Sequence, residues 1–419
     1  MKRVHASFLL AALTFTTAVT AATFRNQSLP SAQFVAATQD KPASRSVITI
    51  PFELVTRHIV VKVKINNSRP LSFVLDTGDR VGIVDTEVAK ELGLKLQGEV
   101  RVGGAGSETL PGSMVADATW TLVGLEGFSQ PVKLAIPLRR LAARFGHDFD
   151  GIIGSEFIKQ FVVEIDYHAR VIRLHDKDKF TYAGPGDSLP IQLSSQGHPI
   201  LEGEVKPLGS EPLKGKFVLD IGSGGPLALT SPFVNENRLL NSNLKTIRAI
   251  GLGGAGGQSN ARIGRVAELK IGKFTITNPI TLFSEDKAGA FASAELAGNI
   301  GQQIASKFKL FLDYGRNRII FEPAATFNEP FDRAHSGLAL SSEGKDYATF
   351  RITEVLEDSP ASEIGLKKDD LIIRVNDKPA AEFTITRLGE MFEQPSSHKL
   401  TIRRGDQTLQ VTLTPRKLV

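Results

Sequence analysis

This chain repeats itself once, and the repeat constrains the fold more than any other feature of the sequence. Three segments recur in the same order at offsets of 144, 150 and 147 residues: 73–78 returns at 217–222, 103–106 at 253–256, and 151–154 at 298–301. Three ordered matches at nearly constant offset indicate a duplicated domain, and two copies are too few for a solenoid. Two similar lobes are expected to pack about a pseudo-two-fold axis.

The local pattern of each copy predicts mostly β-structure. Residues 58–65 alternate apolar and polar side chains, which is typical of a half-buried strand. A short helix is expected over 86–92, with Asp85 as its N-cap and a glycine at its end, and a comparable helix near 232–240. Glycine-rich loops between β-prone stretches predict hairpins at 101–115 and 250–264.

The composition excludes several classes of protein. With 41% hydrophobic and 23% charged residues, the 419-residue chain has the balance of a globular protein. It contains no cysteine, which excludes disulfides, thiolate metal sites and cysteine nucleophiles. The net charge of +5 comes without a long basic run, so nucleic acid is not expected as a partner. Residues 251–256 fit the dinucleotide motif G-x-G-x-x-G, but no helix follows them and a hairpin tip is the preferred interpretation, so neither a metal nor a cofactor is expected.

The N-terminus resembles a secretory signal. Two basic residues precede a short apolar run and a small-residue stretch ending at Ala21, so residues 1–21 are predicted to be a signal peptide and 22–46 a flexible leader. The expected location is periplasmic or secreted, without stable membrane insertion after cleavage. An uncleaved membrane anchor is the alternative interpretation.

Both copies resemble the aspartic proteases, and above all the retroviral-type family and its bacterial relatives. The resemblance rests on Asp-Thr-Gly at 76–78, on the spaced Gly-Ile-Ile-Gly at 151–154, and on their second copies. It implies a mainly β fold with two retropepsin-like, closed β-barrel-like lobes over residues 47–180 and 186–323. It also assigns roles: catalytic Asp76 and Asp220; an active-site loop of Thr77, Gly78, Ile221, Gly222 and Ser223; and flaps containing Gly103, Gly104, Gly106, Gly253, Gly254 and Gly256.

Paired carboxyl groups explain why such chemistry needs two aspartates. Two like charges held close cannot both ionise, so the pair shares one proton. The ionised member can take a proton from water while the protonated member donates to the peptide carbonyl. Each aspartate could instead simply close a strand in a turn, and that is the competing interpretation.

The second loop departs from the family pattern. Ile221 replaces the Thr or Ser whose hydroxyl ties the two loops together, and Asp79 adds a third carboxylate unless Arg80 neutralises it. Asp76 could pair with Asp220 of the same chain or with its own copy in a homodimer. The covalently attached second lobe favours the intrachain pair and a monomer.

A third unit begins after a polar linker at 324–334. Residues 335–419 resemble a PDZ domain through Ser-Pro-Ala at 359–361, Gly-Leu at 365–366 and a strand ending in Val-Asn at 376. Such domains bind peptide termini or internal strands by strand addition. The resemblance assigns the carboxylate loop to Gly337, Leu338, Ala339 and Leu340, although Ala339 stands where a second glycine is usual. A packing module that binds nothing is the alternative.

Together these features predict an aspartic endopeptidase that acts on peptides or unfolded proteins and uses a PDZ module to bind them. The competing prediction is a catalytically silent peptide-binding or scaffold protein with a degenerate protease fold.

Overall fold

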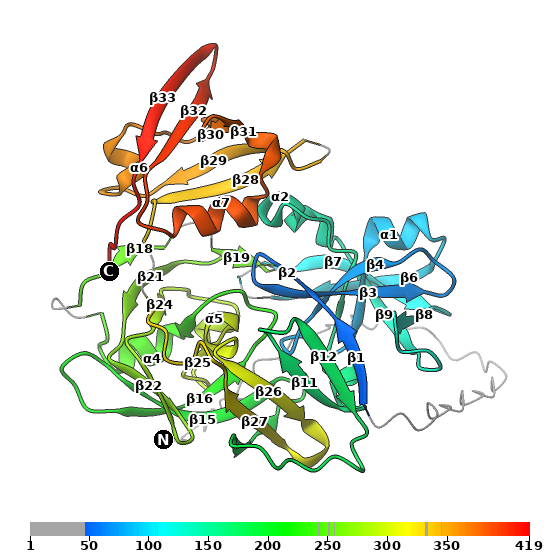
Figure 1. Cartoon of the computed structure of the whole chain (residues 1–419). Helices are drawn as coiled ribbons and strands as arrows, with labels where there is room; N and C mark the ends of the chain where they lie inside the picture. The colour runs from blue at the N-terminus through cyan, green and yellow to red at the C-terminus, as the bar shows by residue number, and fades with distance from the viewer. Residues whose placement is uncertain are drawn as a thin grey trace, which may run out of the picture.

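The computed structural model describes most of the chain from residue 47 onward. The described residues are 47–104, 106, 108–240, 244–249, 252–254, 256–331, 334–344 and 346–419. The predicted signal peptide and leader, residues 1–21 and 22–46, lie outside them. The predicted mainly β fold, followed by a smaller PDZ unit, is confirmed (Figure 1). Within the described part of the chain, no helix is long and apolar enough to cross a membrane.

The first lobe is built on a nine-stranded sheet in the order β2-β3-β4-β10-β5-β9-β7-β6, with β8 pairing β3 and β9. Its strands are β2 (Glu53–Val55), β3 (His58–Ile65), β4 (Leu71–Leu75), β5 (Gly82–Asp85), β6 (Lys95–Val102), β7 (Leu110–Ala116), β8 (Thr119–Leu122), β9 (Gln130–Ile136) and β10 (Gly151–Ile153). Strand β10 runs parallel to β4 and antiparallel to β5, so the segment after β4 lies at the centre of this sheet.

The second lobe repeats this arrangement in a ten-stranded sheet, ordered β18-β21-β24-β17-β25-β16-β15-β22-β23, with β14 beside β15. Its strands are β14 (Gln192–Leu193), β15 (Pro199–Lys206), β16 (Leu213–Leu219), β17 (Leu227–Leu229), β18 (Ile247–Arg248), β21 (Ala261–Arg265), β22 (Glu268–Ile271), β23 (Phe274–Thr277), β24 (Ile280–Ser284) and β25 (Gly298–Ile300). A separate short hairpin is formed by β19 (Gly253–Gly254) and β20 (Gly257–Gln258). Strand β25 runs parallel to β16, as β10 does to β4.

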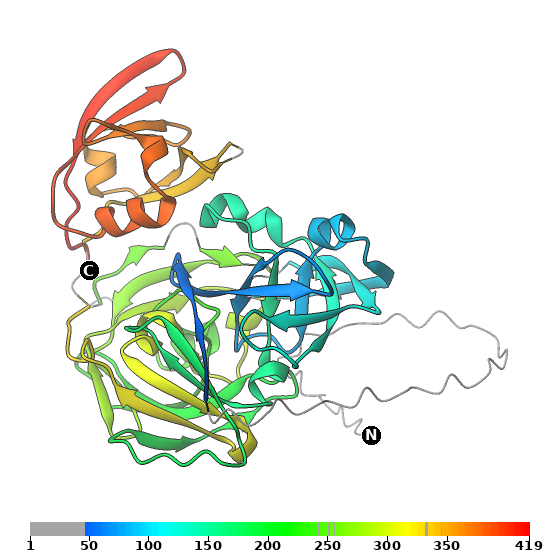
Figure 2. The same ribbon diagram turned by 45° about the vertical axis from the view of Figure 1, so that its right-hand side comes forward.

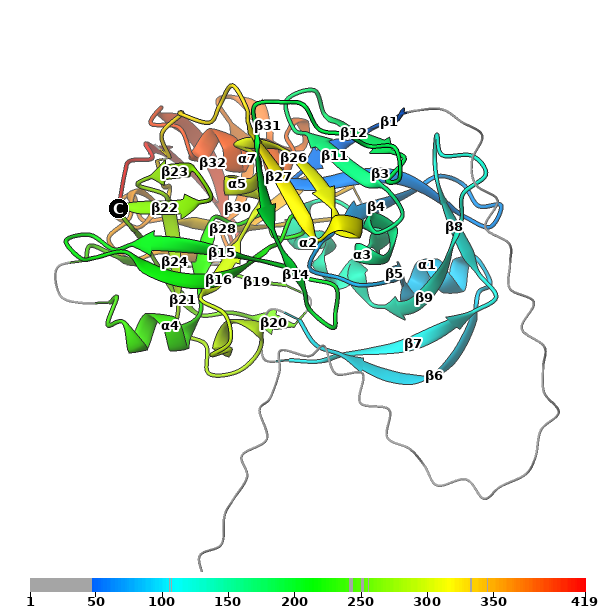
Figure 3. The same cartoon turned by 90° about the horizontal axis from the view of Figure 1, so that it is seen from below.

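A third sheet joins the lobes, and the sequence did not predict it. It has six strands in the order β1-β12-β11-β26-β27-β13. They are β1 (Val47–Pro51), β11 (Val162–Asp166), β12 (Val171–His175), β13 (Asp187–Pro190), β26 (Phe308–Asp313) and β27 (Arg318–Pro323). The lobes meet where β11 pairs antiparallel with β26, Ile165 opposite Leu310 (Figure 3). One hydrophobic core therefore runs through both lobes.

Short helices connect the strands. They are α1 (Thr86–Glu91), α2 (Ala142–Phe145), α3 (Ser155–Ile158), α4 (Ser231–Glu236) and α5 (Gln302–Ala305), with 3₁₀ turns η1 (Leu138–Leu141), η2 (Ala290–Ala292) and η3 (Tyr314–Arg316). The Asp85 carboxylate caps α1 as expected, accepting from the N–H groups of Glu87 and Val88 at 2.9 and 3.2 Å. The predicted helix at 232–240 is shorter, because Arg238 has a positive φ of 50° and the chain turns back there.

The PDZ unit has its own core and sits beside both lobes (Figures 1 and 2). Its sheet order is β28-β29-β30-β32-β33, with β31 beside β30. Its elements are β28 (Leu338–Glu343), β29 (Thr349–Val355), α6 (Pro360–Glu363), β30 (Leu371–Val375), β31 (Lys378–Pro379), η4 (Ala380–Glu382), α7 (Ile385–Phe392), β32 (His398–Arg404) and β33 (Gln407–Leu413).

Candidate active site

Asp76 and Asp220 occupy equivalent places in the two lobes. Each follows the strand that pairs in parallel with the Gly-x-Ile strand of its own lobe. The Asp76 N–H donates to the Ile153 carbonyl and the Asp220 N–H to the Ile300 carbonyl, both at 3.0 Å. The duplicated sequence therefore ends two matching strands with a carboxyl group.

The structure brings these two carboxyl groups together within one chain. The charge of Asp220 acts directly on the Asp76 carboxyl group. A Cβ added at Gly222 would overlap the Asp76 carboxylate, and one added at Gly78 would lie 3.1 Å from Asp220 Oδ1. Each glycine thus leaves room for the carboxyl group of the opposite loop. This geometry is that of the intrachain pair and needs no second copy of the chain.

The two carboxyl groups receive different hydrogen bonds. Asp76 Oδ1 accepts from the Gly78 N–H at 2.6 Å. Asp220 accepts at both oxygens: Oδ1 from the Ser223 N–H and Oδ2 from the Asn299 side-chain amide, each at 2.9 Å. Hydrogen bonds of this kind favour the ionised carboxylate.

Asn299 was missed by the sequence analysis, although the sequence contains a signal for it. The first copy reads Gly-Ile-Ile-Gly and the second Gly-Asn-Ile-Gly, so Asn299 takes the place of Ile152. A polar residue at an apolar position of the repeat is the feature that could have identified it. Ser223, which the sequence analysis placed in the loop, contacts Asp220 through its backbone N–H.

Burial, and next the charge of Asp220, raises the pKa of Asp76 well above its usual value. The charge of Asp79 acts in the same direction. Asp76 therefore holds a proton under conditions in which an exposed aspartate would be ionised.

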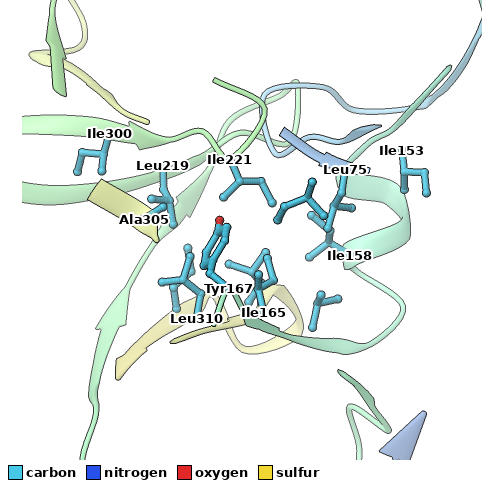
Figure 4. Close-up of a cluster of buried hydrophobic side chains, with 14 of the residues drawn as sticks. Leu75, Ile153, Ile158, Ile165, Tyr167, Leu219, Ile221, Ile300, Ala305 and Leu310 are labelled. Atoms are coloured by element: carbon cyan, nitrogen blue, oxygen red, sulfur yellow. The ribbon is translucent and has the colours of Figure 1, made fainter. Parts of the chain in front are cut away.

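The two active-site loops are tied by one hydroxyl. Thr77 Oγ1 donates to the Leu219 carbonyl at 2.7 Å and accepts from the Ile221 N–H at 3.0 Å, and Thr77 is fully buried. Ile221 has no hydroxyl to return this contact. Its side chain is instead fully buried in an apolar cluster beneath the loops, near Tyr167 and Leu310 (Figure 4).

Arg80 is engaged away from Asp79. Its guanidinium group pairs with Glu156 at 3.2 Å and contacts the Ser195 carbonyl at 3.3 Å. Burial, followed by the charge of Asp220, raises the pKa of Asp79 to about 7. The third carboxyl group thus adds to the shared titration of the pair.

The predicted flaps meet at their tips. The first is the β6–β7 hairpin, with Gly103, Gly104 and Gly106 in its loop, and the second is the β19–β20 hairpin, with Gly253, Gly254 and Gly256. The Glu108 N–H donates to the Gly256 carbonyl at 2.8 Å. A Cβ at Gly106 would overlap Gly256, and one at Gly256 would lie 2.7 Å from the Gly104 carbonyl carbon. Only glycines permit so close an approach of the two backbones.

His58 is a neighbour of the site that the sequence analysis did not identify. Its Nδ1 lies 3.2 Å from the Val55 carbonyl, and its ring packs edge-on against Phe145 with centroids 4.9 Å apart. A Cβ at Gly224, just beyond the second loop, would lie 3.2 Å from its Cε1. Burial lowers the pKa of His58, so the ring is held neutral.

Of the predicted PDZ carboxylate loop, Gly337 to Leu340, only Gly337 precedes β28; the other three residues begin the strand. Gly337 has a φ of 80°, and a Cβ there would overlap Ser359. The Leu338 N–H already donates to Ser336 Oγ at 3.2 Å. The pairing of β28 with β29 shifts register between Ala339 and Leu340. The loop therefore has the expected glycine turn, with one of its N–H groups occupied internally.

Comparison with known proteins agrees with this architecture. Residues 61–157 match a family model described as aspartyl protease, and residues 351–404 match one described as PDZ domain. The resemblance to an aspartyl protease followed by a PDZ domain is thereby confirmed. The first match includes Asp76 and the Gly-Ile-Ile-Gly segment.

Individual relatives are distant. Serine protease HTRA1 of Xenopus laevis is 33% identical over 67 residues, which is 16% of this chain. The chain spans only 14% of the length of that curated relative. Among solved structures, basic 7S globulin from soybean matches with a TM-score of 0.42 and 10% identity, covering 68% of this chain and 97% of that one.

We expect Thr77→Val to lower the free energy of unfolding by about 2–4 kcal/mol, because it leaves the Leu219 carbonyl and the Ile221 N–H buried without partners. Thr77→Ser keeps the hydroxyl and is the matched control. Urea unfolding followed by circular dichroism measures both. Equal losses for the two variants would show that the hydroxyl does not hold the loops together.

We expect Asp79→Asn to reduce the loss of stability on going from acidic to neutral pH. With a pKa of about 7 in the folded protein against 3.8 for an exposed aspartate, Asp79 binds its proton more tightly in the folded state. Its contribution to stability is therefore present at low pH and is lost as the pH rises from about 4 to 7. The variant should melt roughly 2–4 °C higher than wild type at pH 8, the shift that about 1 kcal/mol produces in domains of this size.

Asp117→Asn, which changes a carboxyl side chain that is 76% exposed, is the control for this comparison. Melting curves recorded at pH 5 and pH 8 suffice. A difference between Asp79→Asn and wild type that is the same at both pH values would contradict a titrating Asp79.

Proposed function

We propose that this protein is an aspartic endopeptidase that hydrolyses peptide bonds with water activated between Asp76 and Asp220. The observation that carries the proposal is the contact of two carboxyl groups from duplicated loops, within one chain. The family match over residues 61–157 supports a peptidase of this type. The same match would also fit a protein that has kept the fold and lost the reaction.

The unequal hydrogen bonding of the two carboxyl groups suggests which one acts as general base and which one as general acid. Asp220, which accepts hydrogen bonds at both oxygens from Ser223 and Asn299, is the group positioned to take a proton from the attacking water. Asp76, with its raised pKa, is the protonated member and donates to the carbonyl oxygen of the scissile bond. The tetrahedral species collapses as the C–N bond breaks: the amine nitrogen takes the proton that Asp220 accepted from water, and a hydroxyl group of the intermediate returns a proton to Asp76. The two groups titrate as a pair, so a pH profile reports both together.

The PDZ unit is proposed to bind peptides or unfolded segments along β28. In the described part of the chain, β28 pairs only with β29 and so presents a free edge for strand addition. Binding there would raise the local concentration of substrate near the protease lobes without taking part in the reaction.

A catalytically silent peptide-binding protein is the second candidate. Ile221 favours it, because one half of the contact between the two loops is missing. The meeting of the flap tips at Gly106 and Gly256 also favours it, since the flaps must separate before a substrate can enter.

We expect either Asp76→Asn or Asp220→Asn to abolish hydrolysis of a denatured protein mixture, lowering the rate at least about a thousandfold, because the pair shares one proton and one water. Release of new amino termini from acidic to neutral pH is the measurement. Mixing the two variants should restore nothing, since both carboxyl groups belong to one chain.

Glu87→Gln, an exposed carboxylate variant on α1, is the control and should keep wild-type turnover. An inactive wild-type protein would favour the silent peptide-binding protein. Near-full activity of Asp220→Asn would show that the second lobe is only a structural companion.

We also propose a periplasmic or secreted location, on the strength of the signal-like residues 1–21. Mass spectrometry of the protein from cell fractions tests it: the expected mature chain begins at Ala22. An intact Met1 in the cytoplasmic fraction would contradict the proposal.

A further inference from the structure

One segment of the first lobe, residues 142–148 with α2, contacts the PDZ unit closely. Ser342 Oγ donates to the Ala143 carbonyl at 2.8 Å, and the Tyr347 hydroxyl donates to Asp148 Oδ1 at 2.6 Å. A Cβ added at Gly146 would lie only 3.4 Å from the Cβ of Ile385. Figure 2 shows α2 directly below the PDZ unit.

These contacts fall on the two walls of the PDZ groove. Ser342 belongs to β28 and Ile385 is the first residue of α7, the strand and helix between which the resemblance places a peptide. Ser342 is fully buried and Ile385 is 9% exposed. Residues 142–148 therefore fill the end of the groove farthest from the loop at Gly337.

The same segment also reaches the flap of the second lobe. Arg144 Nη1 donates to the Gly253 carbonyl in β19 at 2.7 Å. Three residues further on, Gly256 accepts from the Glu108 N–H of the opposing flap loop at 2.8 Å. One short segment thus contacts the PDZ groove on one side and the flap on the other.

A second connection runs beside it, through the β2–β3 turn. The Thr56 N–H donates to Thr386 Oγ1 at 3.2 Å, and Arg57 pairs with Glu393 at 2.5 and 2.6 Å, so the turn holds both ends of α7. A Cβ at Gly224, next to the second active-site loop, would lie 3.0 Å from the Thr56 carbonyl. Residues 142–148 and the β2–β3 turn, two of the segments that contact the PDZ unit, are therefore neighbours of the proposed active site.

We propose that residues 142–148 are a latch: they occupy the distal end of the PDZ groove and hold the β19–β20 flap through Arg144. An extended peptide that pairs along β28 past Ser342 must displace them. Their release removes the Arg144 contact to Gly253, so the groove and the flap open together. The docking stands without the proposed hydrolysis, whereas its consequence for turnover rests on that proposed function.

The chain lacks cysteine, so a disulfide trap can be introduced without background. Gly146→Cys with Ile385→Cys places two Cβ atoms about 3.4 Å apart, close to the range of about 3.5–4.5 Å found in disulfides. Gly146→Cys with Gln410→Cys, on β33 at the other end of the PDZ sheet, is the matched control. We expect mild oxidation to crosslink the first pair and not the second, as measured by the loss of two hydrogens in intact mass.

Circular dichroism of the reduced proteins tests whether both variants fold. The left-handed φ of 60° at Gly146 strains the new cysteine in both, and in the control its Cβ would also lie 2.7 Å from Ile385 Cγ2. Failure of the first pair to crosslink in a folded protein, or equal crosslinking of both, would overturn the docking.

Hydrogen exchange at residues 252–258 tests the coupling to the flap. A library of random decapeptides with free carboxyl ends is the probe. We expect the reduced trap to retain peptides and its flap exchange to accelerate at least about tenfold, and the oxidised trap to do neither. Equal retention by both forms, no retention by either, or an unchanged flap would each overturn the latch.

These readouts need no turnover, so an inactive aspartate pair leaves them intact. If the pair is active, oxidation should also slow cleavage of a denatured protein mixture at least about tenfold, and reduction should restore it. If hydrogen exchange confirms the latch but the protein shows no hydrolysis, only the proposed hydrolysis is refuted and the latch stands.

Discussion

The pairing of β11 with β26 is the constraint on which the rest of this structure depends. It makes one sheet out of strands from both lobes, with Ile165 opposite Leu310, and it fixes the rotation of one lobe relative to the other. Two like charges do not approach each other unaided. Buried apolar side chains from both lobes, packed beneath the loops, hold Asp76 and Asp220 where their carboxyl groups touch.

Covalent fusion of the two lobes also explains how the site became unequal. In a symmetric homodimer, every substitution appears on both sides of the two-fold axis. In a duplicated chain, a substitution in one lobe leaves the other unchanged. The second lobe has Ile221 where the first has Thr77, and Asn299 where the first has Ile152. The two carboxyl groups consequently sit in different electrostatic environments.

Sequence reasoning predicted the elements whose causes are local. The N-cap of Asp85, the strand at His58–Ile65 and the PDZ helix near Ile385 follow from short patterns of capping, alternation and turn residues. The approach of Asp76 to Asp220 could also be predicted, because the repeat itself implies a pseudo-two-fold arrangement. Asn299 and His58 could not be predicted as site residues, because each reaches the site through the packing of segments that are distant in the sequence.

The joined sheet has a further consequence for what can be recognised. Lobes that share β11 and β26 cannot swing apart like the halves of a hinge without breaking a central ladder of hydrogen bonds. Any chain reaching the two carboxyl groups would pass beneath the flap loops as a single extended thread. For the proposed endopeptidase, local unfolding of the substrate, more than the identity of its side chains, would then decide which proteins are cleaved. Such an enzyme would select its substrates by their local disorder and not by a particular sequence.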